Sequence, residues 1–356
     1  MQSLQEKYET DRIVWDECAE TYERQIVGGH PDITAFENFE EDLLDKLLRH
    51  VAENQSKPIK LMDIGCGSGR LHLRYGAKTK NGKTLQNNDQ LKSYIQQHSN
   101  LNYEPSLALN LKEVWGIDFS HKMLNIAKDK LKSADLLNSS KPKLTFDQGS
   151  AFELKPESES LFPISICLVN SIGVMQGKAG AEQLFISMKK AVEKAKGIAI
   201  ISNYQKEYIE SYALGQYEST LDVSGQPVWL SPDTFSSEEY RLIPQNYKLA
   251  HSKDQKLKVA VYDKDGKYVT QELVLKRDKA KVEETKKTGE IKTYTDYESN
   301  WYGYDTMDKW INKHWGYKTY HIKTKEIDSL RAEAAQLSVY DPSGILKSFF
   351  ERLGVA

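Results

Sequence analysis

Apolar residues in the first 204 positions follow two patterns, short continuous runs and stripes at helical spacing. The continuous runs predict buried strands at residues 59–64, 114–118, 144–146, 162–169 and 198–201. Stripes of apolar residues three and four positions apart predict helices over residues 36–51, 120–131 and 184–192. Because strands alternate with helices, the pattern predicts an α/β fold built on a mostly parallel sheet.

Beyond residue 204 the chain changes character. Residues 256–262 and 268–276 alternate between apolar and polar side chains and flank the turn sequence Asp263-Lys-Asp-Gly266, which predicts a β-hairpin. Dense Lys and Glu over residues 276–292 indicate a solvated edge or loop, because the acids cancel the bases.

The pattern of the first part returns near the C-terminal end. Apolar positions over 307–311 predict a helix that ends near Gly316, followed by a late core strand at 318–323. Residues 325–354 are expected to form two additional helices with Asp341-Pro342 between them.

These patterns suggest three parts of the chain and one insertion. Asp63 and Asp118 end successive strands but stand 55 residues apart, where a simple βαβ unit needs only about 30 residues in all. The intervening sequence is rich in Asn, Gln, Lys and Ser, and we interpret it as a surface insertion. The expected parts are an N-terminal flap and core at 1–204, with the insertion at about 76–112; a β-rich lid or substrate lobe at 205–300; and the final core strands and C-terminal helices at 301–356.

Composition excludes several classes of function. The 356 residues carry a net charge of −2, so no overall charge attracts nucleic acid. Three scattered cysteines and eight histidines show neither a disulfide framework nor metal-ligand spacing, so we expect no metal. No apolar run approaches the roughly 20 residues that span a bilayer, and Met1–Lys7 contains no apolar signal region. We therefore expect a cytoplasmic protein that does not enter a membrane.

The most informative stretch is Leu61–Arg70, in which an apolar run reaches Asp63 and passes into Gly65-x-Gly67-x-Gly69. Glycine lets backbone approach a ligand closely, although many such loops are ordinary turns. The next strand ends at Asp118, and Ser120 then caps a helix. A strand, a glycine loop, a helix, a strand and an acid together indicate a nucleotide-type site at the carboxyl ends of parallel strands.

Two motifs here resemble those of class I S-adenosylmethionine-dependent methyltransferases. Asp63-Ile-Gly-Cys-Gly-Ser-Gly69 is similar to that family's first motif, and Asp118-Phe-Ser-His-Lys-Met-Leu to its second. A dinucleotide-binding Rossmann domain would place its third glycine at position 70, which is Arg. The resemblance implies a Rossmann-like, seven-stranded, mostly parallel sheet with an inserted β-rich lobe, and S-adenosyl-L-methionine as the cofactor.

The resemblance also assigns cofactor-binding residues. Asp118 would accept hydrogen bonds from both ribose hydroxyls, or it is merely an acid at a helix N-terminus. Met123 would pack against adenine or belong to the core. Ser150 replaces the family's usual acid, so adenine is held differently. The implied set is Asp63, Gly65, Cys66, Gly67, Gly69, Asp118, Phe119, Met123, Ser150, Ala151, Phe152 and Asn170.

Locally, the chain is similar to glycine and sarcosine N-methyltransferases, through the second motif and through Leu168-Val-Asn170-Ser171. That family places an arginine before Asn-Tyr to hold the substrate carboxylate, whereas this chain has Ser202-Asn203-Tyr204. Glycine is therefore not expected as the substrate. The resemblance places Tyr22, Asn170 and Tyr204 beside the transferred methyl group as catalytic candidates.

The expected activity is N-methylation of a small molecule. The chain lacks the Asn/Asp-Pro-Pro-Tyr/Phe and Pro-Cys motifs of DNA methyltransferases, so DNA is not expected. An RNA or protein acceptor, and a non-catalytic cofactor-binding subunit, stay open as alternatives, as does the oligomeric state. Six clustered aromatic residues form either a cage for an ammonium group or ordinary packing: Trp301, Tyr302, Tyr304, Trp310, Trp315 and Tyr317.

Overall fold

The computed structural model of the chain describes residues 12, 15, 16, 19, 31–78, 110–137, 142–169, 171–204, 255–262, 268–275, 302–324 and 335–355. For residues 31–39, 77–78, 204, 255–262 and 268–275 it describes the backbone alone. The expected insertion, apart from its two ends, and most of the expected lobe at 205–300 lie outside the described residues.

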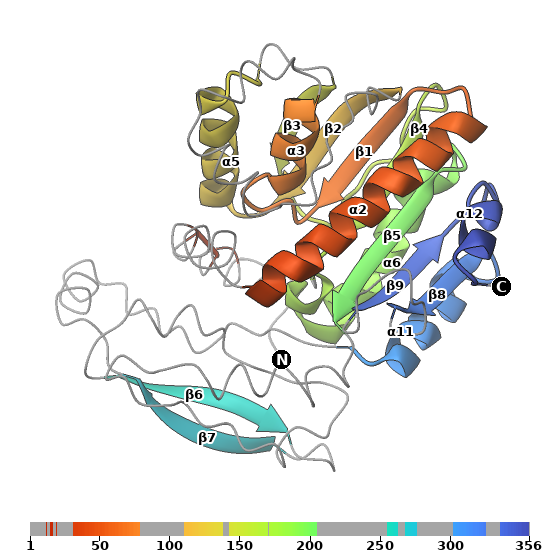
Figure 1. The fold of residues 1–356 in the computed structure, drawn as a ribbon. Coiled ribbons are helices and arrows are strands. Elements are labelled where there is room, and N and C mark those ends of the chain that lie inside the picture. The colour runs from red at the N-terminus through yellow and green to blue at the C-terminus, as the bar shows by residue number, and fades with distance from the viewer. Residues whose placement is uncertain are drawn as a thin grey trace.

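Seven strands form one sheet in the order β3-β2-β1-β4-β5-β9-β8 (Figure 1). The strands are β1 (Ile59–Ile64), β2 (Leu111–Asp118), β3 (Lys143–Gln148), β4 (Phe162–Cys167), β5 (Ile198–Tyr204), β8 (Thr319–Lys323) and β9 (Ala335–Tyr340). The first five pair in parallel, whereas β9 pairs antiparallel with both β5 and β8. The predicted Rossmann-like, mostly parallel, seven-stranded sheet is confirmed.

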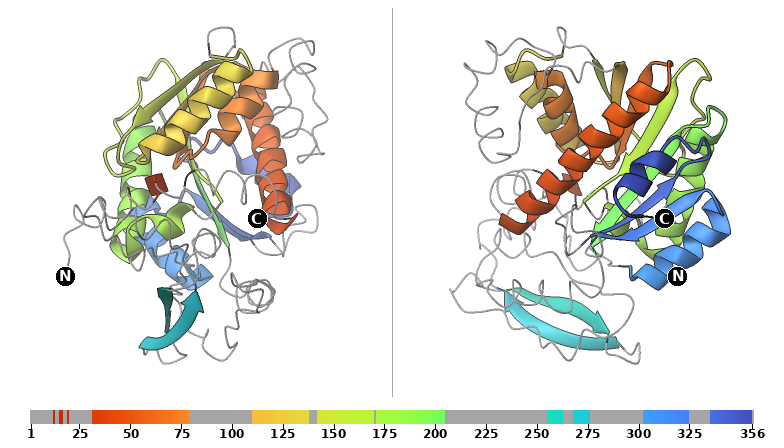
Figure 2. Two further views of the ribbon diagram at one scale, coloured as in Figure 1. Left: turned by 90° about the vertical axis from the view of Figure 1, so that its left-hand side faces the viewer. Right: turned by 45° about the vertical axis from the view of Figure 1, so that its right-hand side comes forward.

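Helices cover both faces of the sheet (Figure 2). One face carries α2 (Pro31–Asn54), α3 (Arg70–Lys78) and α12 (Lys347–Arg352), with α5 (His121–Ser133) beside α3. The other face carries α6 (Gly177–Glu193), α11 (Tyr304–Trp310) and the π-helical turn η7 (Ile311–Trp315). Because both faces are covered, the central strands are mostly apolar, and all six residues of β4 are buried.

The short apolar runs located the strands well. β1 has the predicted bounds, and the predicted apolar face of α5 is buried: Met123, Leu124, Ala127 and Leu131. The predicted hairpin is also confirmed as β6 (Gln255–Tyr262) paired antiparallel with β7 (Tyr268–Leu275).

The prediction of two helices over 325–354 is wrong in its first half. Residues Ala335–Tyr340 form β9, and only α12 is helical among the described residues of that range. The polar Gln336 lies buried in the strand, where its Nε2 donates to the Tyr302 carbonyl at 2.6 Å and its Oε1 lies 3.1 Å from His321 Nε2. A buried polar strand residue of this kind is stabilised by partners far away in sequence, so the local pattern concealed the strand.

Of the six clustered aromatic rings, Tyr302, Trp310 and Trp315 pack the interior and do not form a cage. Tyr302 and Trp310 meet edge to face at 4.8 Å, and Phe185 lies 4.7 Å from Trp315. All four rings are buried. Tyr304 stacks on His321 and Tyr317 is 93% exposed, whereas Trp301 lies outside the described residues. The cage interpretation is therefore wrong for these rings, and the packing interpretation holds.

None of the helices in the described part of the chain combines the length and apolarity that crossing a membrane requires.

Candidate functional site

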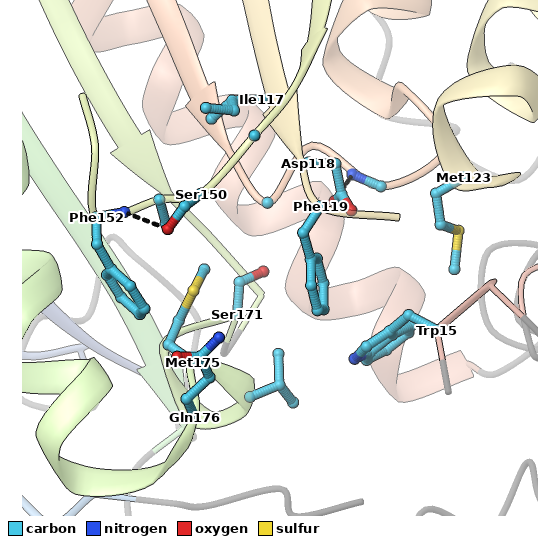
Figure 3. A pocket seen from close by; sticks show the side chains of 15 residues that line it. Trp15, Ile117, Asp118, Phe119, Met123, Ser150, Phe152, Ser171, Met175 and Gln176 are labelled. Carbon is cyan, nitrogen blue, oxygen red and sulfur yellow. Dashed lines mark hydrogen bonds between the residues drawn. The ribbon is translucent and has the colours of Figure 1, made fainter. Parts of the chain in front are cut away.

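A pocket opens at the carboxyl ends of the strands (Figure 3). It lies where the chain order reverses between β1 and β4, the position at which open α/β sheets bind ligands. The lining residues are Trp15, Gly65, Gly67, Ile117, Asp118, Phe119, Met123, Gly149, Ser150, Ala151, Phe152, Ser171, Val174, Met175 and Gln176.

The glycine loop between β1 and α3 is fixed to the end of β2. The amides of Gly65 and Cys66 donate to the Ile117 carbonyl at 2.8 and 3.2 Å. Gly67 has a φ of +50°, and a Cβ built on it would meet no atom within 4 Å, so its bare backbone faces open pocket. At Gly69, by contrast, a Cβ would lie 2.9 Å from the Ala127 Cβ. The loop therefore presents backbone to the pocket at one glycine and packs against α5 at another.

Asp118 joins the two motifs. Its Oδ2 accepts from the Gly67 amide at 2.9 Å and its Oδ1 accepts from the Ser120 amide at 2.8 Å. Each carboxylate oxygen has further lone pairs, so the side chain still has capacity for two ligand hydroxyls. Burial raises the pKa of Asp118 to about 6, against the lowering effect of those two amides.

Asp63 lies behind the glycine loop with its side chain buried. Burial raises its pKa to about 7, the Arg70 guanidinium lowers it, and the charges of Asp118 and Glu40 raise it. Glu40 is a second buried carboxyl near Arg70, and burial raises its pKa to about 7 while the Arg70 guanidinium lowers it.

A short piece of the N-terminal segment closes one side of the pocket. Trp15 lines it next to Phe119 and Met123 (Figure 3). The neighbouring Asp16 Oδ1 accepts from the Ser120 hydroxyl at 2.7 Å and from the Lys122 amide at 3.1 Å. Asp16 therefore caps α5 together with Ser120, which holds the segment against the strand that carries Asp118.

The opposite wall comes from the turn after β3. The Ser150 Oγ accepts from the Phe152 amide at 3.2 Å, so the hydroxyl keeps its own proton for a ligand. Phe152, Met175 and Ile117 give this end an apolar surface that fits a planar ring.

Most of the cofactor-binding residues expected from the resemblance meet in this pocket. Those that line it are Gly65, Gly67, Asp118, Phe119, Met123, Ser150, Ala151 and Phe152. Asp63, Cys66 and Gly69 are not among the lining residues, and Cys66 Sγ packs against Gly116. Tyr22 and Asn170 lie outside the described residues. Tyr204 ends β5, but its side chain is not described.

Two parts of the pocket were not predicted from the resemblance. They are the turn that follows β4, and Trp15 from the N-terminal segment. The short 3₁₀ helix η3 (Ser171–Val174) and the next two residues curl under the pocket. The missed lining residues are Trp15, Ile117, Gly149, Ser171, Val174, Met175 and Gln176. The turn residues could have been predicted from their position in the sequence, because they follow the fourth strand and ligands bind at the carboxyl ends of such strands.

The ends of β4 and β5 are linked by a residue from α2. Ser202 is completely buried and its hydroxyl donates to Glu40, while the Val169 amide donates to Glu40 Oε1 at 2.8 Å. The resemblance to glycine and sarcosine N-methyltransferases implies an arginine for the substrate carboxylate at the position of Ser202. Since Ser202 is enclosed, it does not take over that role.

No group of three or more His, Cys, Asp or Glu side chains within the described ranges is arranged to hold a metal ion.

No protein-family model matches the sequence, and no curated protein matches it. Among solved structures, the chain is similar to a S-adenosylmethionine-dependent methyltransferase from Clostridium acetobutylicum, at 14% identity and a TM-score of 0.43 over 91% of this chain and 97% of that chain. It is similar to the CcbJ methyltransferase from Streptomyces caelestis, at 12% identity and a TM-score of 0.41 over 93% and 98%. The magnesium protoporphyrin IX methyltransferase from Synechocystis with bound SAM gives 14% identity and a TM-score of 0.36 over 74% and 94%. The strand order by itself establishes the fold.

Proposed function

We propose that this protein is a S-adenosylmethionine-dependent methyltransferase. The observation that carries the proposal is the arrangement of Asp118, which ends β2, holds the Gly67 and Ser120 amides and lines the pocket at the chain reversal of the sheet. This is the chemistry that a ribose next to a glycine loop requires.

The residues of the pocket fit the cofactor. Gly67 leaves open the space that a Cβ would fill, so its backbone can approach the methionine part. The Asp63 carboxylate, which ends the apolar run before the loop and is buried, would orient the amino group directly or through water. Asp118 would hold the ribose, and Ser150 and Phe152 would hold adenine.

S-adenosylmethionine, when bound, supplies a methyl group that its sulfonium charge activates for displacement. The protein has to align the acceptor, exclude water and leave the accepting atom unprotonated. We assign this alignment to Tyr22, Asn170 and Tyr204, as the resemblance implies. Trp15 and Phe119 shield the pocket from solvent on the ribose side.

The acceptor we propose is the amine of a small molecule. The second motif and Leu168-Val-Asn170-Ser171 support this through their similarity to glycine and sarcosine N-methyltransferases. The enclosed Ser202 argues against glycine itself. An RNA or protein acceptor, or a non-catalytic cofactor-binding subunit, remains the alternative; DNA is not expected, and a cytoplasmic location stays a prediction.

The test uses the purified full chain, methyl-labelled S-adenosylmethionine and whole-cell extract separated by size. Label in the small-molecule fraction supports the proposal and yields a product for mass spectrometry. Label in large molecules would instead favour RNA or protein, which nuclease and protease treatment distinguish. Cofactor binding by calorimetry without any transfer would favour the non-catalytic subunit, and an absence of binding would contradict the whole assignment.

A further inference from the structure

Glu40 is a buried acid that projects from α2, outside the sheet, onto the carboxyl ends of its strands. Its exposure is 2%, and it lies 129 residues before Val169 and 162 before Ser202 in the chain. An acid is rarely buried so completely unless its charge is compensated. Its partners therefore indicate what its burial accomplishes.

Among the described residues, the acceptor contacts of Glu40 go to the ends of β4 and β5 and to the first residue of α3. Oε1 accepts from the Val169 amide at 2.8 Å and from the Ser202 hydroxyl. Oε2 accepts from Arg70 Nη2 at 3.1 Å. The Val169 amide also lies 3.2 Å from the Ser202 Oγ, so the three groups close a small ring of hydrogen bonds.

The backbone at Val169 requires such support. Its φ is +51°, a left-handed conformation that is an outlier for a β-branched residue. Strained conformations of this type persist when their surroundings determine them, and they cluster at functional sites. Two positions beyond Val169, η3 begins at Ser171, which lines the pocket and whose amide donates to the Leu168 carbonyl at 3.0 Å.

The second partner connects this turn to the glycine loop. Arg70 is the first residue of α3, directly after Gly69. The loop and the turn already touch, because a Cβ on Gly65 would lie 3.3 Å from the Ser171 Cβ. Glu40 thus holds both sides of this contact from behind.

We propose, resting on the function proposed above, that Glu40 is a positioning residue for methyl transfer. By accepting the Val169 amide it holds the turn after β4 in its left-handed conformation, and by binding Arg70 it fixes that turn against the glycine loop. Glu40 touches neither cofactor nor acceptor. Its effect falls on the alignment of the acceptor and much less on the affinity for the cofactor.

The neighbouring Glu41 provides a matched control. It is also buried on α2 and also binds Arg70, at 3.1 Å from Oε1 to Nη1, but its second partner is Arg74 at 2.5 Å. A variant at Glu41 therefore disturbs the same ion cluster without removing the acceptor of the Val169 amide.

The experiment compares Glu40→Ala, Glu40→Gln and Glu41→Gln in the full chain. It measures amide hydrogen exchange resolved to Val169, the Kd of S-adenosylhomocysteine by calorimetry, and methyl transfer from saturating labelled S-adenosylmethionine to the extract. For Glu40→Ala we expect exchange at Val169 to rise by about tenfold or more, since the amide loses a charged acceptor. Transfer should fall by about thirtyfold while the Kd changes by less than about threefold.

Glu40→Gln should recover much of both losses, because its amide oxygen still accepts from Val169 and Ser202. Glu41→Gln should leave exchange at Val169 and transfer within about twofold of wild type. Should Glu40→Ala fail to fold, Ser202→Ala gives a second test, since it removes one partner of the same ring; we then expect faster exchange at Val169 and slower transfer.

Unchanged exchange at Val169 in Glu40→Ala would overturn the proposal. So would equal losses in Glu40→Ala and Glu41→Gln, which would mark a general effect of the ion cluster. If the wild-type chain neither binds S-adenosylhomocysteine nor transfers label, the methyltransferase function fails as well. The exchange rates then still decide whether Glu40 holds the turn, because they require no ligand.

Discussion

Two turns at the same edge of the sheet are held in the same way but are built from different residues. At the end of β2, Asp118 accepts the amide of Gly67, whose φ is +50°. At the end of β4, Glu40 accepts the amide of Val169, whose φ is +51°. In both cases a buried carboxylate fixes a left-handed backbone.

The difference lies in the residue that adopts the conformation. Glycine adopts a left-handed φ at almost no cost, so the first turn needs Asp118 chiefly for orientation. Valine adopts it at a cost of roughly 1–2 kcal/mol or more, so the second turn depends on its distant partner. We infer that the glycine loop beside Asp118 keeps its conformation with little help from distant residues. The backbone at Val169, by contrast, is strained and depends on tertiary contacts.

The largest effect on cofactor binding is expected from Gly67→Val in the glycine loop. The new side chain would enter the open space that the cofactor would fill, in a backbone conformation that valine disfavours. We expect the affinity for S-adenosylmethionine, measured by calorimetry, to fall by more than about a hundredfold, or roughly 3 kcal/mol. Gly354→Val is the control. Gly354 also has a positive φ, and a Cβ built on it would meet no atom within 4 Å, but it does not line the pocket. Equal affinities in Gly67→Val and wild type would refute the placement of the cofactor.

Asp118→Ala tests the carboxylate itself. The change removes the acceptor of the Gly67 and Ser120 amides together with the proposed ribose contacts. A hydrogen bond to a charged group is worth about 1.5–3 kcal/mol, so the loss of even one ribose contact should raise the Kd by about tenfold to a hundredfold. Asp147→Ala is matched to it, since Asp147 accepts from Trp115 Nε1 at 2.7 Å at the end of β3 without lining the pocket. If both variants bind equally well, Asp118 is a capping acid and nothing more.

The stability of the fold and the affinity for the cofactor should both depend on pH through Asp63 and Asp118. Burial raises the pKa of Asp118 to about 6 and of Asp63 to about 7 from 3.8, so the folded chain holds protons that the unfolded chain releases. These two groups therefore lower stability as the pH rises from about 4 to 7. A cationic ligand favours the ionised forms, so we expect the affinity for S-adenosylmethionine to rise about tenfold between pH 5.5 and 7.5. Asp63→Asn should flatten this profile; a profile unchanged by that substitution would speak against Asp63 as the titrating group.

The smallest effect concerns the N-terminal segment. Asp16→Ala removes a cap that joins this segment to α5 beside Asp118. Losing a cap costs about 1 kcal/mol, so the affinity should fall by about fivefold. Quenching of Trp15 fluorescence by the cofactor offers the measurement, since this ring lines the pocket. Arg12→Ala breaks the 3.1 Å ion pair with Asp16 and leaves the cap in place, and it should bind nearly as well as wild type. A weaker affinity in Arg12→Ala than in Asp16→Ala would contradict the role of the cap.

The sequence determined the features whose physical cause is local. Apolar runs located strands β1 to β5, because strands covered on both faces are built mostly from apolar residues. Ser120 and the four apolar positions of α5 identified that helix, and the spacing of Gly65, Gly67 and Gly69 located the loop. Each of these signals lies within one element or one turn.

Tertiary structure alone decided the rest. β9 pairs with β5 and β8, and its buried Gln336 has partners at Tyr302 and His321, so a strand stands where helices were predicted. No local pattern connects Glu40 with Val169 and Ser202, and a valine gives no sign of a left-handed turn. The physical reason is the same in both cases. A conformation that a residue adopts by its own chemistry, such as a positive φ at glycine, can be recognised from sequence. A conformation that depends on a distant partner can be recognised only in the folded chain, where the two residues meet.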